Sequence, residues 1–366
     1  MIFAPETILI ANIRLIGDVI LTTPLIDLLK KAYPEAAIDF LANRGTGEFL
    51  EQDPRVRTVI YHDGDEIGLK KASRYLPKIL RRYDLAINMN SADRGNMAAS
   101  LAGKKCRIGF YDSPNYLKSI WQRLLLTHAI GFPTGIPVAR YCRVVAQILN
   151  IPHEHLEVKV YWDRGDETTV NRILKERGVS RPFFVMHPFA RWIYKHWDLE
   201  RFAAVSDQIC RRFNLQPVWT TSSSAQEKDR LFEVAGKVRH KPIMISGELT
   251  LNQMTYLIGR ANFYLGLDTA ISHLAASTGI PMVALYGPTF TSRWFPWYNE
   301  GPADQECPSG RGILRRGNIA VLQKDWECVP CGKAGCDDTG RFPSPCILDF
   351  SVEEVLSAVH VLMPQF

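Results

Sequence analysis

Short apolar segments alternate with helical patterns through the first half of the chain, and the same alternation restarts in the second half. The segments that read as strands cover residues 7–12, 38–42, 58–61, 84–88 and 107–109, and then 183–187, 217–220, 242–245, 263–266 and 281–285. Helical patterns lie between them, at 17–31, 166–177, 199–212, 225–237 and 250–260 and from near Ser272, and a last one covers 351–363. Such alternation places helices on both faces of a parallel sheet, so the sequence predicts an α/β fold with two doubly wound halves.

A stretch without this alternation of strand and helix patterns, 150–165 (NIPHEHLEVKVYWDRG), separates the two halves. A chain of 366 residues is long enough for two hydrophobic cores. We therefore predict an N-terminal domain over 1–155, a C-terminal domain over 156–350 and a C-terminal helix within 351–366, with the two domains facing across a cleft. Residues 295–346, rich in Gly, Pro and Cys, are predicted to have little regular structure.

Composition and charge limit the partners of the chain. No apolar run reaches the roughly 18 residues of a membrane span, and the first residues lack the pattern of a signal peptide, so we expect a cytoplasmic protein. The formal net charge is +6, which favours an anionic substrate or an anionic membrane surface. Nucleic acid is not expected, because no dense Lys/Arg block is interleaved with aromatic residues.

The stretch NIRLIGDVILTTP places Arg14 and Asp18 where a strand hands over to a helix. In α/β sheets this edge borders the crevice where ligands bind, so both residues, with Gly17, are candidates for a ligand site. The alternative is that Asp18 only complements the dipole of the helix that it begins.

A second polar cluster follows the strands of the other half. In YLGLDTAISHLAASTGIPMVALYGPT, Asp268 and Thr269 end a strand and His273 lies about one helical turn later. Lys195, in HPFARWIYKHW, follows another strand and suits a phosphate group. The N–H groups at a helix start attract anions, and Gly266 leaves room for a ligand near the backbone. The alternative for Asp268 and Thr269 is a helix cap, with His273 an interior residue.

Several common nucleotide and hydrolase motifs are absent from the sequence. There is no G-x-x-x-x-G-K-[ST] and no G-x-G-x-x-G after a strand, which counts against P-loop NTPases and dinucleotide oxidoreductases. H-E-x-x-H and G-x-S-x-G are also missing, which counts against metalloproteases and α/β-hydrolases.

Taken together, ILIANIRLIGDVILTTPLIDLLKKAYP and GLDTAISHLAASTGIPMVALYGPT resemble glycosyltransferase family nine, the ADP-heptose:lipopolysaccharide heptosyltransferases. The resemblance implies a GT-B fold of two Rossmann-like domains, with the acceptor on the first and the nucleotide sugar on the second. It implies an inverting transfer of heptose from ADP-heptose to the lipopolysaccharide core without metal or other cofactor. Two alternatives remain: the same fold with another nucleotide sugar, or a nucleotide-sugar-binding protein without turnover.

The resemblance also assigns roles to residues. Asp18 takes the position of the general base, and Gly17 lies beside it on the acceptor side. For Arg14 the sequence leaves two roles: it binds the phosphates of the acceptor, or it pairs with Asp18. Lys195 matches the lysine near the pyrophosphate, and the donor-contacting stretch is matched by Asp268, Thr269 and His273. Glu227, in SSSAQEKDR, is the candidate for the acidic residue that holds the nucleoside. Two departures are Ala270, where the family often has Gly, and the absence of hydroxyl residues from 189–191.

Four cysteines near the C-terminus have the spacing C-x2-C-x4-C-x9-C: Cys328, Cys331, Cys336 and Cys346. Such a group binds zinc or an iron–sulfur cluster in some proteins. This spacing matches neither a common zinc ribbon nor a plant-type ferredoxin. Reduced structural thiols or redox-labile pairs remain the alternative, and no metal is assigned to the site.

Basic residues of the first half form three clusters: Lys104, Lys105 and Arg107; Arg81 and Arg82; and Arg140 and Arg143. If the acceptor is anchored in lipid, these clusters predict a peripheral, salt-sensitive contact with the inner face of the cytoplasmic membrane. The alternative for each cluster is an ordinary solvated surface.

Overall fold

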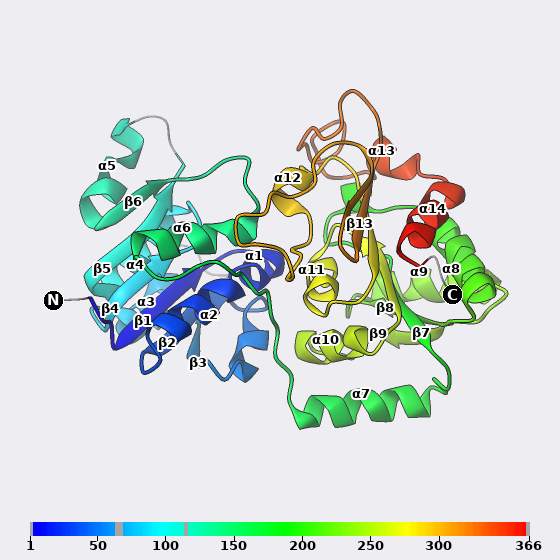
Figure 1. The fold of residues 1–366 in the computed structure, drawn as a ribbon, viewed down its shortest axis with the longest axis horizontal. Helices are drawn as coiled ribbons and strands as arrows, with labels where there is room; N and C mark the ends of the chain where they lie inside the picture. Colours follow the sequence, from blue (N-terminus) through cyan, green and yellow to red (C-terminus); the bar gives the residue numbers. More distant parts are fainter. Residues whose placement is uncertain (1–2, 63–68, 113–115, 364–366) are drawn as a thin grey trace. The chain divides into compact units, whose positions relative to one another are not determined.

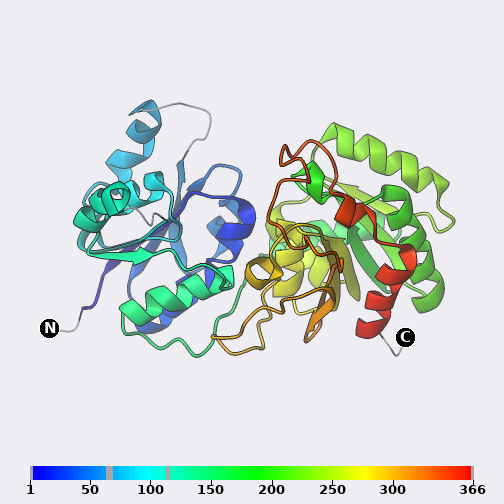
Figure 2. The same cartoon turned by 90° about the horizontal axis from the view of Figure 1, so that it is seen from above.

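In the computed structural model, which describes residues 3–62, 69–112 and 116–363, the chain divides into two units. Unit 1 comprises Met1–Tyr161 and Gly301–Gln305, and unit 2 comprises Trp162–Glu300 and Glu306–Phe366. Each unit holds one predominantly parallel sheet with helices on both faces (Figures 1 and 2). The predicted α/β fold with two doubly wound halves is therefore confirmed.

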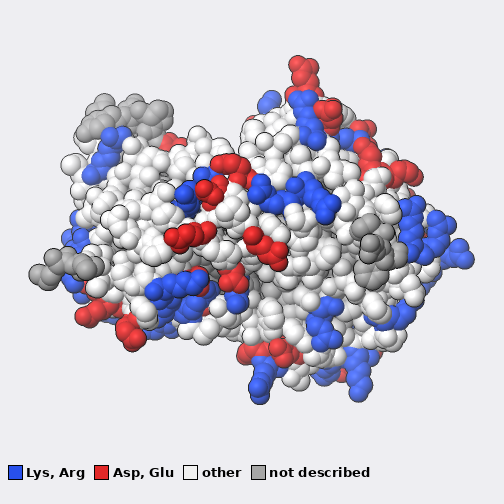
Figure 3. Space-filling model, in the orientation of Figure 1, with Lys and Arg blue, Asp and Glu red and all other residues white. Residues whose placement is uncertain are grey.

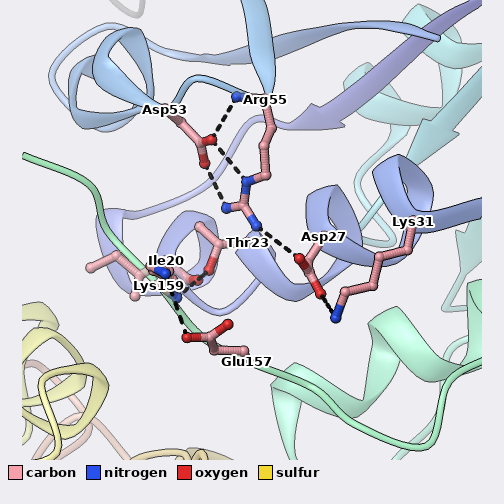
Figure 4. Close-up of polar contacts among 8 residues, drawn as sticks. All are labelled: Ile20, Thr23, Asp27, Lys31, Asp53, Arg55, Glu157 and Lys159. Carbon is pink, nitrogen blue, oxygen red and sulfur yellow. Dashed lines mark hydrogen bonds and ion pairs between the residues drawn. The ribbon is translucent and has the colours of Figure 1, made fainter. Parts of the chain in front are cut away.

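The boundary between the units lies after Tyr161, whereas the sequence places it after residue 155. The intervening residues belong to unit 1 because they bond to it. The backbone N–H of Lys159 donates to Thr23 Oγ1 at 3.1 Å (Figure 4). The guanidinium of Arg55 lies over the ring of Tyr161, 4.9 Å from its centroid. The charged residues of this stretch hide, in the sequence, a segment that contacts α2 and the turn before β3.

Two later segments also differ from the predicted domains. Residues 301–305 belong to unit 1, where the N–H of Ala303 donates to the carbonyl of Glu154 at 3.1 Å. The C-terminal helix, α14 (Val352–Leu362), is part of unit 2 and not a separate element. It contributes buried side chains, Val355 among them, to the same core as α8 (Leu199–Phe213).

The sheet of unit 1 has six strands in the order β3-β2-β1-β4-β5-β6, with every neighbouring pair parallel. Its strands are β1 (Thr7–Asn12), β2 (Ala37–Asn43), β3 (Val56–His62), β4 (Tyr83–Asn88), β5 (Gly103–Tyr111) and β6 (His128–Gly131). The sequence predicts all of these except β6. That strand has four residues and none of them is buried, so it carries no apolar pattern.

Helices cover both faces of this sheet: α1 (Ile16–Ile20), α2 (Thr23–Ala32), α3 (Leu69–Ile79), α4 (Asp93–Ala102), α5 (Tyr116–Leu125) and α6 (Tyr141–Ile148), with short 3-10 turns at Glu48–Gln52 and Val138–Arg140. The prediction of a single helix over 17–31 is wrong, because the helix is interrupted at Leu21 and Thr22. Pro24 has no N–H for the carbonyl of Ile20, and a proline ring clashes with that carbonyl inside a continuous helix. It is tolerated here because it lies in the first turn of α2.

The sheet of unit 2 has seven strands in the order β12-β13-β11-β10-β7-β8-β9, and only the β12–β13 pair is antiparallel. Its strands are β7 (Phe183–His187), β8 (Gln216–Thr221), β9 (Ile243–Ser246), β10 (Phe263–Leu267), β11 (Met282–Tyr286), β12 (Gly312–Arg316) and β13 (Ile319–Gln323). The expectation of little regular structure over 295–346 is wrong for β12 and β13. Every residue of β13 is buried, since it lies between β11 and β12. Its apolar run is short and is surrounded by Gly and Arg, which conceals it in the sequence.

On one face of this sheet α8 contacts α9 (Ala225–Lys237) and α14 over the larger hydrophobic core. The other face carries α7 (Arg164–Glu176), α10 (Leu251–Gly259) and α11 (Ala270–Ser277), which contact one another in sequence α7–α10–α11. Short elements complete the unit: α12 (Thr291–Trp294), α13 (Pro345–Leu348) and a 3-10 turn at Ile193–Lys195. Among the described residues, no helix combines the length and apolar character of a membrane span.

Candidate functional site

In each sheet the strand order reverses, and the predicted ligand residues lie at these two reversals. In unit 1 the reversal is between β1 and β4, and in unit 2 it is between β7 and β10. Parallel α/β sheets bind ligands at such points, outside the carboxyl ends of the strands. Arg14, Gly17 and Asp18 follow β1, whereas Lys195 follows β7 and Asp268 follows β10.

Asp18 lies in α1, and its side chain is 15 % exposed. The Nε of Arg14 lies 4.0 Å from the Oδ1 of Asp18, and the Arg14 side chain is 47 % exposed. Gly17 precedes Asp18 in the same helical turn. A carboxylate that is partly accessible and held at a strand end is able to accept a proton from a hydroxyl group bound beside it.

A buried amide fixes the backbone at Asp18. The Nδ2 of Asn12 donates to the Asp18 carbonyl at 3.0 Å and to Thr22 Oγ1 at 2.8 Å. The Thr22 hydroxyl donates to the same carbonyl at 2.8 Å, and Asn90, after β4, donates to Asn12 Oδ1 at 3.3 Å. A satisfied buried network of this kind holds its members in one geometry. Sequence reasoning missed these three residues, although Asn12 ends an apolar strand at a position where a core favours an apolar side chain.

Three segments of unit 2 meet at the carboxylate of Asp268. The Nζ of Lys195 lies 2.5 Å from Asp268 Oδ2, and the hydroxyl of Thr289 donates to the same oxygen at 2.5 Å. The side chains of Lys195 and Asp268 are only 16 % and 6 % exposed. The structure therefore brings together the lysine and the aspartate that the sequence predicts. It adds Thr289, which follows β11 and lies in the quoted GPT turn.

Thr269 and His273 differ in what they do within the structure. Thr269 caps α11, because its hydroxyl accepts a hydrogen bond from the N–H of Ile271 at 3.1 Å. His273, one turn later, is 3 % exposed, and its Nδ1 is buried with no hydrogen-bond partner in the described chain. Burial lowers the pKa of His273 to about 4, so its ring is neutral at neutral pH. Thr269 is therefore a helix cap, as the alternative for it predicts. The Nδ1 of His273, near Asp268, forms no hydrogen bond in the described chain.

Gly266 does not leave the open space that the sequence suggests. A Cβ added there would collide with the hydroxyl of Tyr264. That hydroxyl lies 3.2 Å from Ser272 Oγ, which in turn donates to the carbonyl of Leu267 at 2.5 Å. The missing side chain at Gly266 therefore accommodates Tyr264, which packs the end of β10 against α11.

Glu227 lies in the first turn of α9, beside the end of β8, the strand next to β7. Its Oε2 accepts hydrogen bonds from Thr221 Oγ1 at 2.7 Å, Ser222 Oγ at 2.6 Å and the Ser222 N–H at 3.1 Å. Within the described part of the chain, Oε1 receives none. Burial lowers the pKa of His187, which ends β7, to about 4, and the negative charge of Glu227 opposes this shift. Glu227 therefore belongs to the same sheet edge as Lys195, with one oxygen anchored.

The four terminal cysteines differ in burial: Cys328, Cys331 and Cys336 are exposed, and Cys346 is buried. Burial, and then the neighbouring thiols, raise the pKa of Cys346 to about 11. Over residues 3–62, 69–112 and 116–363, no group of three or more His, Cys, Asp or Glu is arranged to hold a metal ion. The cysteine segment does touch the candidate site, because the N–H of Gly332 donates to the carbonyl of Pro288 at 2.7 Å.

Comparison with known proteins gives consistent matches. The model of glycosyltransferase family 9 (heptosyltransferase) matches residues 74–302, which include Lys195 and Asp268 but not Asp18. Lipopolysaccharide heptosyltransferase 3 of Escherichia coli is 28 % identical over 295 residues, which are 78 % of this chain and 85 % of that protein.

Two solved structures cover nearly the whole chain. A family 9 glycosyltransferase from Veillonella parvula is 19 % identical with a TM-score of 0.75, covering 100 % of this chain and 99 % of its own. Escherichia coli ADP-heptose lipopolysaccharide heptosyltransferase II is 20 % identical with a TM-score of 0.71, covering 98 % and 99 %. These likenesses confirm the predicted GT-B fold of two Rossmann-like domains.

Proposed function

The chain belongs to glycosyltransferase family 9, the family of the heptosyltransferases, and from this membership we propose that it transfers a heptose from ADP-heptose to the core of lipopolysaccharide. The similar Escherichia coli proteins carry these substrates in their names: lipopolysaccharide for one, and ADP-heptose with lipopolysaccharide for the other. In this chain, the observation that carries the proposal is the convergence of Lys195, Asp268 and Thr289 at the strand-order reversal of unit 2.

In the proposal, unit 2 binds the nucleotide sugar. Lys195 contacts the pyrophosphate, and the N–H groups at the start of α11 add to the attraction for its negative charge. Asp268 holds the ammonium of Lys195 in place, since it lies 2.5 Å away. Thr269 and His273 line the same helix start, and Glu227 offers Oε1 to the nucleoside.

Unit 1 binds the acceptor in this proposal, and Asp18 is the general base. An inverting transfer needs a base within hydrogen-bond reach of the attacking hydroxyl, while the leaving nucleotide gains negative charge. Protein groups, Lys195 above all, stabilise that charge, so the reaction proceeds without a metal ion. Arg14 and Gly17 lie at the same turn as Asp18 and contact the acceptor.

A thermal-shift screen with ADP-sugars and UDP-sugars tests the donor. At one hundred times its Kd, a ligand adds about 2.7 kcal/mol to the stability of the unit that binds it. We therefore expect ADP-heptose to raise the Tm by several degrees, and UDP-sugars to leave it unchanged. A larger shift with a UDP-sugar than with any ADP-sugar would contradict ADP-heptose as the donor and favour the alternative nucleotide sugar.

We further propose that unit 1 binds reversibly to an anionic membrane surface. The guanidinium of Arg107 donates to the carbonyl of Leu125 at 2.7 Å, which places a basic group beside the end of α5. Leu124 and Leu125 are 74 % and 44 % exposed there. Lys105 is partly neutralised, since its Nζ lies 3.1 Å from Asp84. Basic and acidic side chains are interspersed on the face drawn in Figure 3, so the attraction is modest.

Sedimentation with vesicles tests this contact. Each Lys or Arg near an anionic surface contributes about 1 kcal/mol, and salt screens that attraction. We expect the protein to sediment with vesicles rich in anionic lipid at low salt and to be released at high salt, whereas vesicles of neutral lipid leave it in solution. Equal sedimentation with both vesicle types, or with neither, would contradict an electrostatic contact.

A further inference from the structure

Arg94 lies beside the Asp18 turn but has no part in the function described so far. It is in the first turn of α4, which follows β4, so it lies at the strand-order reversal of unit 1. Its Nη2 donates to the carbonyl of Ile13 at 2.8 Å. That carbonyl directly precedes Arg14, whose own carbonyl accepts a hydrogen bond from Asn43 at 3.1 Å. Side chains from α4 and β2 therefore fix the segment that carries Arg14.

The charge around Arg94 is not balanced by the protein. Among the described residues, Arg94 forms no ion pair, and its neighbour in sequence, Asp93, accepts a hydrogen bond from Gln122 at 2.9 Å instead. Partial burial and the charge of Arg14 lower the pKa of Arg94. Arg14 in turn has Asp18 at 4.0 Å. The guanidinium of Arg94 is thus bonded to the residue before Arg14 and lies within electrostatic range of the Arg14 side chain.

Like charges at short range are unfavourable unless an anion lies between or beside them. A guanidinium has five N–H donors in a planar fork that suits phosphate and carboxylate groups. The bond to Ile13 occupies one nitrogen of Arg94, and no hydrogen bond of the Arg14 guanidinium is found within the described chain beyond its contact with Asp18. The pair therefore keeps donors for a ligand.

We infer that Arg94 and Arg14 form an anion subsite for a phosphate monoester or a sugar carboxylate of the acceptor, next to Asp18. The inference rests on the proposed function, because it takes the acceptor to be a saccharide that reacts at Asp18. The subsite selects anionic acceptors: a saccharide that places its charged group between the two arginines is held with a hydroxyl near the base. A neutral saccharide of the same shape lacks this hold.

Calorimetry without donor tests the subsite. The probes are a phosphorylated core oligosaccharide, the same oligosaccharide after phosphatase treatment, and its carboxyl-reduced form. Loss of one charge-assisted contact weakens binding by about tenfold to a hundredfold. We expect Arg94→Gln to weaken binding of the untreated oligosaccharide to this extent. The treatment that removes the bound group, phosphate or carboxylate, lowers wild-type affinity similarly, and Arg94→Gln has no further effect on that treated form.

Two further variants separate recognition from folding and from general charge. Arg94→Lys keeps the positive charge but loses the planar fork, so we expect an intermediate affinity. Lys78→Gln removes one exposed positive charge elsewhere in unit 1 and is expected to bind like the wild type. If Arg94→Gln and Arg94→Lys both bind the untreated oligosaccharide as the wild type does, the inference is wrong. The donor thermal shift is measured separately, so that result leaves the proposed donor function standing.

Discussion

Replacement of Asp18 by Asn is expected to abolish heptose transfer while the affinity for ADP stays within a few-fold of the wild-type value. The amide keeps the shape of the side chain but cannot take the proton of an attacking hydroxyl at neutral pH. Loss of a general base lowers kcat by about 10² to 10⁴. Initial rates at saturating donor and acceptor measure the first part, and calorimetry with ADP measures the second.

Asp27 provides a matched control for this variant. It lies in α2, where its carboxylate pairs with Lys31 at 2.7 Å and with Arg55 at 3.4 Å (Figure 4). We expect Asp27→Asn to lose some stability, because Arg55, whose side chain is 13 % exposed, then keeps only Asp53 as a carboxylate partner. We expect the variant to keep its turnover. Near-native turnover of Asp18→Asn would remove Asp18 from the role of base and leave it as a residue of the helix start.

Lys195→Ala is expected to weaken ADP binding by about tenfold to a hundredfold, the usual effect of losing a charged contact. The variant also leaves Asp268, 6 % exposed, without the ammonium that lies 2.5 Å from it, so some loss of stability is expected as well. Asp268→Ala removes that carboxylate and is expected to weaken donor binding more than acceptor binding. Calorimetry with ADP and thermal unfolding of each variant separate the two effects.

Lys237 is the control for charge, because it forms ion pairs with Glu200 and Glu233 on the exposed surface of unit 2. We expect Lys237→Ala to bind ADP as the wild type does. If Lys195→Ala also binds ADP with unchanged affinity, Lys195 lies outside the nucleotide site, and the convergence at Asp268 serves only the stability of unit 2.

The strands could be predicted from the sequence because most of them are apolar runs bounded by turn residues. The rule that polar residues after parallel strands share one edge of a sheet then related Lys195 to Asp268, which are far apart in sequence but in direct contact. The same reasoning failed for β6 and β13, where a short strand or charged flanking residues left no pattern. These two strands form because of their place in the sheet and their burial, and neither property can be read from a short stretch of sequence.

The finer parts of the candidate site depend on side chains that no motif links. Asn12, Thr22 and Asn90 hold the Asp18 turn through bonds between separate segments. Arg94 follows a polar stretch, NMNSAD, that has no hydrophobic periodicity, so the sequence predicts no role for it. Gly266 illustrates the opposite error: a glycine near a predicted ligand site suggested open space, whereas Tyr264 already occupies it.

Transfer of heptose in the presence of EDTA tests the central claim most directly. The purified protein is incubated with ADP-heptose and a set of lipopolysaccharide cores truncated at successive sugars, and the products are followed by mass spectrometry and by NMR of the anomeric centre. The account predicts that one of these cores gains a heptose with inverted anomeric configuration, that ADP is released in equal amount, and that EDTA does not slow the reaction. A set of cores that all stay unmodified, with ADP-heptose intact or merely hydrolysed, would contradict it.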